Sequence, residues 1–281
     1  MNVNIDQAVA IQWPSFQGQA ALVGASPSGR VTVYVDATLG QPGHQNARDL
    51  LADADRVVRA NDQFFGTSSG NVRVIVFALG GATDGTGGAD HMGCDYIVGD
   101  NIEVCAAFGK SMRVSALFEA ELSECNMGGN LCGVSTGEAL SRWCAASVSK
   151  NALGDFATAP TWFNDGTPDF VSKTDPTDRS ADSTGCGMVF ISWLLSQNFE
   201  LGAIARGLVA LGAGGTFSKL YGALTGKDPK TAWTMFMTAV NGLSGGVTSD
   251  DPFAAMKSVQ AALAAIRPVS HRLQLPSSPR Q

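Results

Sequence analysis

The sequence lacks the features that mark several classes of protein. Its 19 Lys and Arg residues are scattered, with no basic run, and are outnumbered by 25 Asp and Glu, so nucleic acid is not an expected partner. No apolar run approaches the ~20 residues that span a bilayer. Residues 1–6 carry neither the basic nor the apolar region of a secretory signal. The default compartment is therefore the cytoplasm, with non-classical export left open.

Cysteine pairs at metal-binding spacing are also missing. None of the six cysteines forms a C-x-x-C pair, which argues against a structural zinc site. Their even number leaves disulfides open, for example between Cys125 and Cys132, whereas the missing signal favours thiols. The chain is instead rich in apolar residues: 44% of its 281 residues are hydrophobic and 16% are charged. That composition can bury a large core, as one domain or as two lobes.

Strand-like and helix-like patterns divide the chain into two parts. Residues 30–36 and 72–79 are runs of β-branched residues typical of strands, and residues 46–64 between them have apolar side chains at helical spacing. Two short strands, a hairpin, are predicted at residues 96–98 and 102–107. From Ser111 onward the patterns predict helices, namely 111–127, one from 135, 184–197, 201–212, 216–224, 230–241 and 252–265.

This order predicts an α+β fold, in which an N-terminal mixed sheet with a backing helix and one further helix is followed by an all-α lobe. We divide the chain accordingly. The predicted parts are an irregular segment (1–29), an α/β lobe (30–128), a helical lobe (129–267) and a flexible tail (268–281). Within the helical lobe, residues 152–170 are predicted to be a loop because of Pro160, Gly166 and Pro168.

The helix predicted at residues 111–127 carries an unusual set of carboxylates. Zinc peptidases of the zincin type use H-E-x-x-H on a helix, where the two His bind the metal and the Glu acts as base. The corresponding residues here are 120–124, with the sequence A-E-L-S-E. Glu121 keeps the place of the base, but Ala120 and Glu124 stand where the histidines would be. The chain therefore has the setting of a metallopeptidase without its metal ligands.

The order of elements resembles the zincin metallopeptidase fold across residues 30–150. In that family a sheet with one backing helix leads through an edge strand to the active-site helix, and in the gluzincin branch a Glu on a following helix is the third ligand. Residues 136–143 (T-G-E-A-L-S-R-W) are similar to that segment. The resemblance implies Glu121 as base, with Glu124 and Glu138 as metal ligands or partners. His91 could join them from the edge strand.

The carboxylates also suggest chemistry of their own. Glu121 and Glu124 are three residues apart and so share one helix face. With Glu138 they would favour a hard cation such as Ca²⁺, Mg²⁺ or Mn²⁺ over zinc, because no imidazole is present. Without metal, crowded carboxylates raise one another's pKa, which suits a general acid or base.

A purely structural role for these residues is the alternative. In that interpretation Glu119 is solvated, Glu121 and Glu124 pair with Arg113 and Arg142, and the fold is an inactive descendant of an enzyme.

Other segments offer weaker candidates. Residues 80–88 are rich in glycine but lack the G-x-x-x-x-G-K-[ST] phosphate loop. Cys186 could be a nucleophile near a helix start, with His44 or His91, or a small residue that allows close packing. Three aspartates could bind calcium or form a helix-capping loop: Asp175, Asp178 and Asp182. The tryptophans Trp143, Trp162, Trp193 and Trp233 are expected in the core.

Two classes of function follow. The first is a zincin-like protein without zinc-binding histidines, a pseudo-metallopeptidase used for binding a peptide or protein, or for self-assembly into a homo-oligomer. The second is a hydrolase of peptidase type that uses Glu121 with Glu124 and Glu138, with or without a hard metal ion. The missing histidines favour the first class slightly.

Overall fold

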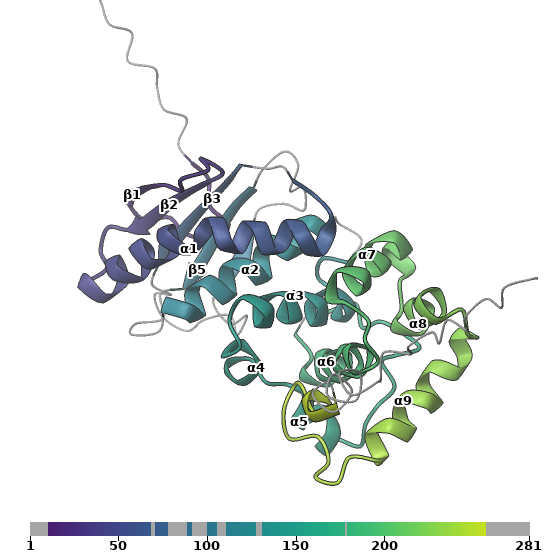
Figure 1. The fold of residues 1–281 in the computed structure, drawn as a ribbon. Coiled ribbons are helices and arrows are strands. Elements are labelled where there is room, and N and C mark those ends of the chain that lie inside the picture. Colours follow the sequence, from purple (N-terminus) through teal and green to yellow (C-terminus); the bar gives the residue numbers. More distant parts are fainter. Residues whose placement is uncertain are drawn as a thin grey trace, which may run out of the picture.

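The computed structural model of the chain describes residues 11–68, 71–77, 89–91, 100–105, 111–127, 131–177 and 179–256. Across these ranges a sheet lobe at the N-terminal side is followed by a lobe made of helices (Figure 1). This confirms the predicted α+β fold class with its helical lobe. A helix both long and apolar enough to cross a membrane is not found in this part of the chain.

In the described part of the chain the sheet has five strands, in the order β1-β2-β3-β5-β4. The three central strands run parallel to one another, and each edge strand runs antiparallel to its neighbour. The strands are β1 (Ala20–Ala25), β2 (Val31–Asp36), β3 (Val72–Phe77), β4 (Ala89–His91) and β5 (Asp100–Cys105). The β-branched residues of β2 and β3 suit central strands that are covered on both faces.

Two helices cover one face of this sheet, α1 (Gln41–Phe65) and α2 (Ser111–Met127) (Figure 1). Proline in the first turn of α1 and Gly66 in the left-handed conformation after its last residue set its two ends. The apolar residues of both helices pack on the strands to form one core, which includes Val33, Val74, Ile102, Leu50, Val57, Phe118 and Leu122.

The other face of the sheet is covered by the segment that precedes β1. Trp13 packs there with Ile75 and Phe77. The segment is held by Glu103, a buried residue of β5 whose carboxylate accepts hydrogen bonds from the backbone N–H of Ser15 and of Phe16, at 2.9 and 3.0 Å, and from the Ser15 hydroxyl. The central strands of the sheet are therefore covered on both faces, whereas edge strand β1 has no fully buried residue.

The helical lobe is built around α6 (Ala181–Ser196), almost all of whose side chains are buried. Its Phe190 ring lies 5.2–5.3 Å from the ring centroids of Trp193, Phe217 and Phe236. The surrounding helices are α3 (Ser135–Val148), α7 (Leu201–Leu211), α8 (Phe217–Thr225) and α9 (Ala232–Asn241). Three of the four tryptophans expected in the core are buried, and Trp233 is half-buried against it.

Three sequence predictions differ from the structure. Strand β1 lies within residues predicted to be irregular, because its alanines and glycine become a strand only by pairing with β2. Two short helices, α4 (Ala152–Asp155) and α5 (Ala159–Asn164), occupy the predicted loop. Helix α1 begins five residues before its predicted start. The predicted strand at 96–98 and the tail from residue 268 lie outside the described residues, as does the glycine-rich segment 80–88.

Candidate functional site

The helices α2 and α3 pack directly against each other, so the carboxylates of the two helices can meet (Figure 1). A close backbone approach helps to fix this contact. A Cβ atom at Gly137 would lie 2.0 Å from the backbone oxygen of Leu131, in the turn before α3. Only glycine fits at this position. Gly137 thereby fixes the first turn of α3, which also carries Glu138.

Glu138 forms an ion pair within α3. Its Oε1 accepts a hydrogen bond of 2.5 Å from Nε of Arg142, one helical turn later. Nη1 of the same guanidinium donates to the backbone oxygen of Phe156 at 2.8 Å. The side chains are 17% and 23% exposed for Glu138 and Arg142, respectively. The guanidinium is thus held on two sides and remains within reach of solvent.

Glu138 also contacts the carboxyl group of Glu124, which projects from α2. Burial raises the pKa of Glu138 to about 7, the Arg142 charge lowers it, and the charge and hydrogen bond of Glu124 raise it again. Two carboxyl groups in hydrogen-bond contact require a proton between them, so Glu124 and Glu138 act as a pair. We call Glu124, Glu138 and Arg142 the α2–α3 carboxyl site.

The other expected site residues are placed as follows. Glu121 is half-buried on α2, three residues before Glu124. His91 is the last residue of β4 and pairs with Ile102 of β5. Strand β4 lies beside α2, but the His91 side chain is outside the described part of the structure. The structure therefore brings Glu124 and Glu138 together and leaves the convergence of Glu121 and His91 on them as a prediction.

The α2–α3 carboxyl site does not fit a metal ion. A guanidinium already sits on Glu138 at hydrogen-bond distance, where a ligand of zinc or of a hard cation would need a free carboxylate oxygen. Across the described ranges, three or more His, Cys, Asp or Glu side chains are nowhere grouped so that they could hold a metal ion. The positive charge beside Glu124 and Glu138 comes from the protein itself.

Besides the partner of Arg142, which is Glu138 rather than Glu121 or Glu124, the structure corrects two details of the purely structural interpretation. Glu119, expected to be solvated, is fully buried, and neither carboxyl oxygen has a hydrogen-bond partner among the described residues. Arg113, expected to pair with a glutamate of its own helix, places its guanidinium over the Phe156 ring, 5.1 Å from the centroid. The reason is the same in both cases. Side chains on all sides of α2 meet other elements, which its sequence pattern does not show.

Cys186 is not an activated thiol. It is fully buried within α6, and burial raises its pKa well above the usual value, the opposite of the lowering expected at a helix start. Its neighbours show a packing role instead. A Cβ at Gly185 would lie 2.5 Å from the backbone oxygen of Thr158, and one at Gly187 would lie 2.6 Å from the Ala139 side chain. Small residues here allow α6 to approach α3 and α5 closely.

The loop that contains Asp175 connects to the starts of α3 and α6. Asp175 exchanges hydrogen bonds with Ser135, through its backbone N–H to Oγ at 2.9 Å and through its backbone oxygen at 3.1 Å. Ser180, rather than an aspartate, caps α6, and Asp178 lies outside the described residues. The five cysteines of the described part are thiols, so Cys125 and Cys132 are not joined in a disulfide.

One buried carboxylate near the site was not foreseen. Asp250 is fully buried, and its Oδ1 accepts hydrogen bonds from the backbone N–H of Thr158 and Ala159, at 2.9 and 2.7 Å, at the start of α5. Its charge interacts with that of Arg142. No sequence signal could have found this contact, because the two segments are about ninety residues apart and capping patterns operate over three or four.

Comparison with protein-family models, with curated proteins and with solved structures finds no match to this chain.

Proposed function

We propose that this chain is a zincin-like protein without zinc chemistry, a scaffold that works by binding or self-assembly rather than by metal-dependent peptide hydrolysis. The observation that carries the proposal is the ion pair between Glu138 and Arg142. Glu138 stands where the zincin resemblance implies the third metal ligand. The Arg142 guanidinium supplies at this position the positive charge that a metal ion would supply. A fixed internal cation leaves no open coordination position for substrate.

The order of elements supports this proposal. A sheet with parallel central strands, the backing helix α1 and an antiparallel edge strand precede α2, and β4 lies beside α2. This is the arrangement that the zincin resemblance implies, with α2 in the place of the active-site helix. The residues on α2 depart from the family at both histidine positions, so the likeness concerns the scaffold rather than the reaction.

The test removes the Arg142 guanidinium and offers a divalent metal ion in its place. The wild-type protein should contain substoichiometric metal by elemental analysis, and its Tm should not change when Mn²⁺ or Zn²⁺ is added. Arg142→Ala removes the guanidinium from the Glu124–Glu138 pair, so this variant should gain a divalent-ion-dependent rise in Tm, since a ligand that binds only the folded state stabilises it.

The control is Arg142→Ala combined with Glu138→Gln, which should lose the gained response. Stoichiometric zinc in the wild-type protein, with peptidase activity abolished by a chelator, would contradict the proposal.

A second candidate function is a metal-independent hydrolase, favoured by the pKa of about 7 at Glu138. In such a reaction one carboxylate of the pair takes a proton from water as the water oxygen bonds to the substrate carbonyl carbon. The protonated partner gives its proton to the leaving nitrogen as the carbon–nitrogen bond breaks. A carboxyl group with a pKa near neutrality, as at Glu138, suits acid–base catalysis of this kind.

This candidate predicts hydrolysis of peptide or ester substrates in the presence of a chelator. The rate should depend on pH near 7 and should be lost in both Glu124→Gln and Glu138→Gln. The matched control is Glu200→Gln, because Glu200 is an exposed carboxylate at the start of α7. Equal residual rates in all three variants would attribute the activity to a contaminant and remove this candidate.

A further inference from the structure

The chain before β2 is free of charge over a long stretch. Residues 7–29 contain no Asp, Glu, Lys, Arg or His, although 16% of the whole chain is charged. The described part of this stretch includes the segment that Glu103 holds against the sheet and the edge strand β1. The described residues of this stretch therefore carry no charge of their own, and the Asp55 carboxylate of α1 meets them at Ser28, in the turn after β1.

Strand β1 has an open edge in the described sheet, because it pairs with β2 alone. The backbone N–H of Ala37 donates to the oxygen of Gln19 at 2.9 Å. Hydrogen-bonded pairs alternate along an antiparallel ladder, so Ala21 is the next residue bonded to β2. Ala20 and Leu22 consequently turn their backbone N–H and C=O groups away from β2, toward the open edge.

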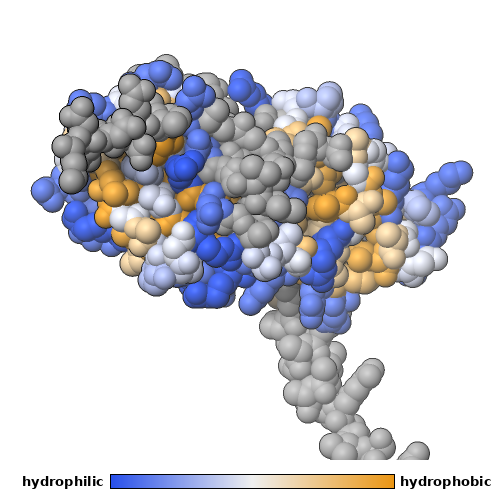
Figure 2. Space-filling model, turned by 90° about the horizontal axis from the view of Figure 1, so that it is seen from above, coloured by the Kyte–Doolittle hydropathy of each residue, from blue (hydrophilic) through white to orange (hydrophobic). Residues whose placement is uncertain are grey.

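The side chains along this edge are apolar as well. Leu22 is 65% exposed, the largest value among the exposed large hydrophobic residues of the described chain. It lies opposite Tyr34 on the face where the Trp13 ring packs against Tyr34, with centroids 5.5 Å apart. Figure 2 shows that apolar surface is exposed on the sheet lobe as well as on the helical lobe.

Natural proteins usually protect such an edge with charges, proline or a bulge. Of these, β1 has a register shift between Leu22 and Gly24, and neither charge nor proline. The shift bends the strand beyond Leu22 and leaves residues 19–22 as its regular part. The edge is thus short but able to pair with another strand.

We propose that β1 pairs with β1 of a second copy of this chain, antiparallel about a two-fold axis, so that the two sheets become continuous. This inference rests on the proposed function, of which it takes the self-assembly alternative. A two-fold contact places each surface against itself, and any charge would then face a like charge at close range. Residues 19–25, which include β1, contain no charged side chain that would cause such repulsion.

The expected dimer is weak. Two short strands bury less surface than the roughly 1,200 Å² at the lower end of stable interfaces, so association should be reversible and depend on protein concentration.

Sedimentation of charge-swapped variants tests the proposal. Leu22→Lys and Leu22→Glu each place two like charges across the two-fold axis, within reach of each other on adjoining strands. Each variant alone should dissociate at concentrations where the wild type is dimeric, and an equimolar mixture of the two should recover the dimer. Leu22 is exposed, so both variants keep the fold, which circular dichroism checks.

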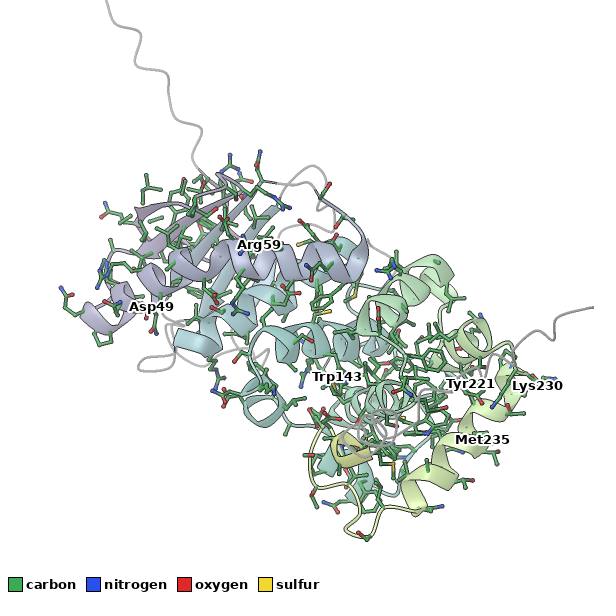
Figure 3. The ribbon with its side chains drawn as sticks, in the orientation of Figure 1. Asp49, Arg59, Trp143, Tyr221, Lys230 and Met235 are labelled. Carbon is green, nitrogen blue, oxygen red and sulfur yellow. The ribbon has the colours of Figure 1, made fainter. Side chains whose placement is uncertain are left out.

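Met235→Lys is the matched control, since Met235 is 45% exposed on α9, at the opposite end of the molecule from β1 (Figure 3). It should sediment as the wild type does. Hydrogen exchange gives a second readout: the amides of Ala20 and Leu22 should become more protected as the protein concentration rises.

The outcomes separate this inference from the proposed function. Oligomers that persist unchanged in both Leu22 variants would overturn the β1 contact and leave self-assembly standing. A monomer at all concentrations would overturn the β1 contact together with the self-assembly alternative. Protection of Ala20 and Leu22 that is independent of concentration would show that the edge is occupied by the chain itself, and would also overturn the inference.

Discussion

The side chain of Glu119 lies fully buried in the middle of α2, and within the part of the chain that the structure describes neither of its carboxyl oxygens has a hydrogen-bond partner. Burial raises its pKa well above the usual 4.5, which the charge of Arg56 only partly offsets. A buried carboxyl group without partners is far cheaper in its neutral form. Glu119 thus keeps its proton to a higher pH in the folded protein than in the unfolded chain.

Glu119→Gln should therefore stabilise the protein at high pH. The unfolded chain loses the Glu119 proton near pH 4.5, whereas the folded state keeps it to higher pH. The folded state consequently binds more protons in this interval, and stability falls as the pH rises. Glutamine has the shape of the protonated acid and does not titrate. The Tm of the variant should exceed that of the wild type at pH 8, and the difference should shrink toward pH 4, measured by calorimetry.

Glu138 also has a raised pKa, and here the pH interval over which stability changes is defined. Its pKa of about 7 lies above the usual 4.5, so its contribution to stability is complete below about pH 4.5 and is lost as the pH rises through 7. The linkage between proton binding and folding gives a loss of unfolding free energy on the order of 1–2 kcal/mol, after allowance for the partial exposure of the side chain. Glu138→Gln should remove this slope from denaturant unfolding measured between pH 4.5 and 8.

Glu200→Gln serves as the exposed control for both variants and should leave the pH dependence of unfolding unchanged. A Glu138→Gln variant whose unfolding free energy falls with pH as steeply as the wild type would show that another group titrates in this interval.

Residues of the site could be predicted only where one helix carries the pattern. Glu124 and Glu138 were found from their place in the A-E-L-S-E and T-G-E-A-L-S-R-W segments, and Arg142 from its presence nearby. The burial of Glu119 could not be predicted, because it depends on what packs against each side of α2. The partner of Arg142 was also assigned wrongly, because a glutamate one turn away on its own helix competes with those of α2.

Among the elements, α5 shows how a short helix can depend on a distant segment. It has six residues, too few to be stable by itself, and the side chain of Thr158 does not cap it. Its first N–H groups are bound instead by Asp250. Because prolines and a glycine lie in and around α5, the sequence predicts a loop there. The side chain that caps the helix, Asp250, comes after α9 in the chain, where no local pattern can indicate it.

Asp250→Ala should cost about 1–3 kcal/mol of unfolding free energy, because two buried backbone donors lose their acceptor. Asp250→Asn keeps an acceptor oxygen at nearly the same position and removes the charge, so its cost should be clearly smaller. Denaturant unfolding at pH 7 measures both. Equal losses in the two variants would mean that the charge near Arg142, rather than the cap, is what Asp250 contributes.

Long, strongly patterned elements were predicted well, in contrast. Helix α2 has the predicted bounds, and α7, α8 and α9 begin and end within two residues of theirs. β1 was missed because a strand rich in alanine carries no local signal. Its pairing partner supplies the structure, and the pairing lies outside what a local window of sequence contains.

At the scale of the whole molecule, the two lobes share helices rather than a linker. Phe65 of α1 and Ala116 of α2 belong to the same apolar cluster as Phe190 and Trp193 of α6, although both helices also cover the sheet. Unfolding of one lobe would expose the helices that the other lobe packs against. The described chain is therefore expected to unfold in a single cooperative transition.

One polar contact joins the lobes at the end of α1. Nη1 of Arg206 on α7 donates to the backbone oxygens of Gln63 and Phe64, at 3.2 and 3.1 Å. Carbonyls in the last turn of a helix lack partners within it and carry partial negative charge, so a guanidinium is favourable there. The contact is exposed to solvent, which limits its strength to about 1 kcal/mol or less.

Arg206→Met should consequently lower the unfolding free energy by at most about 1 kcal/mol while loosening the junction locally. Hydrogen exchange of the amides in the last turn of α1 should accelerate, because that turn then opens without breaking a contact to α7. Arg59→Met is the control, since Arg59 lies on the exposed side of α1 away from this junction (Figure 3). Two separate thermal transitions in the wild type would contradict the shared-helix view, because the lobes would then melt independently despite their common core.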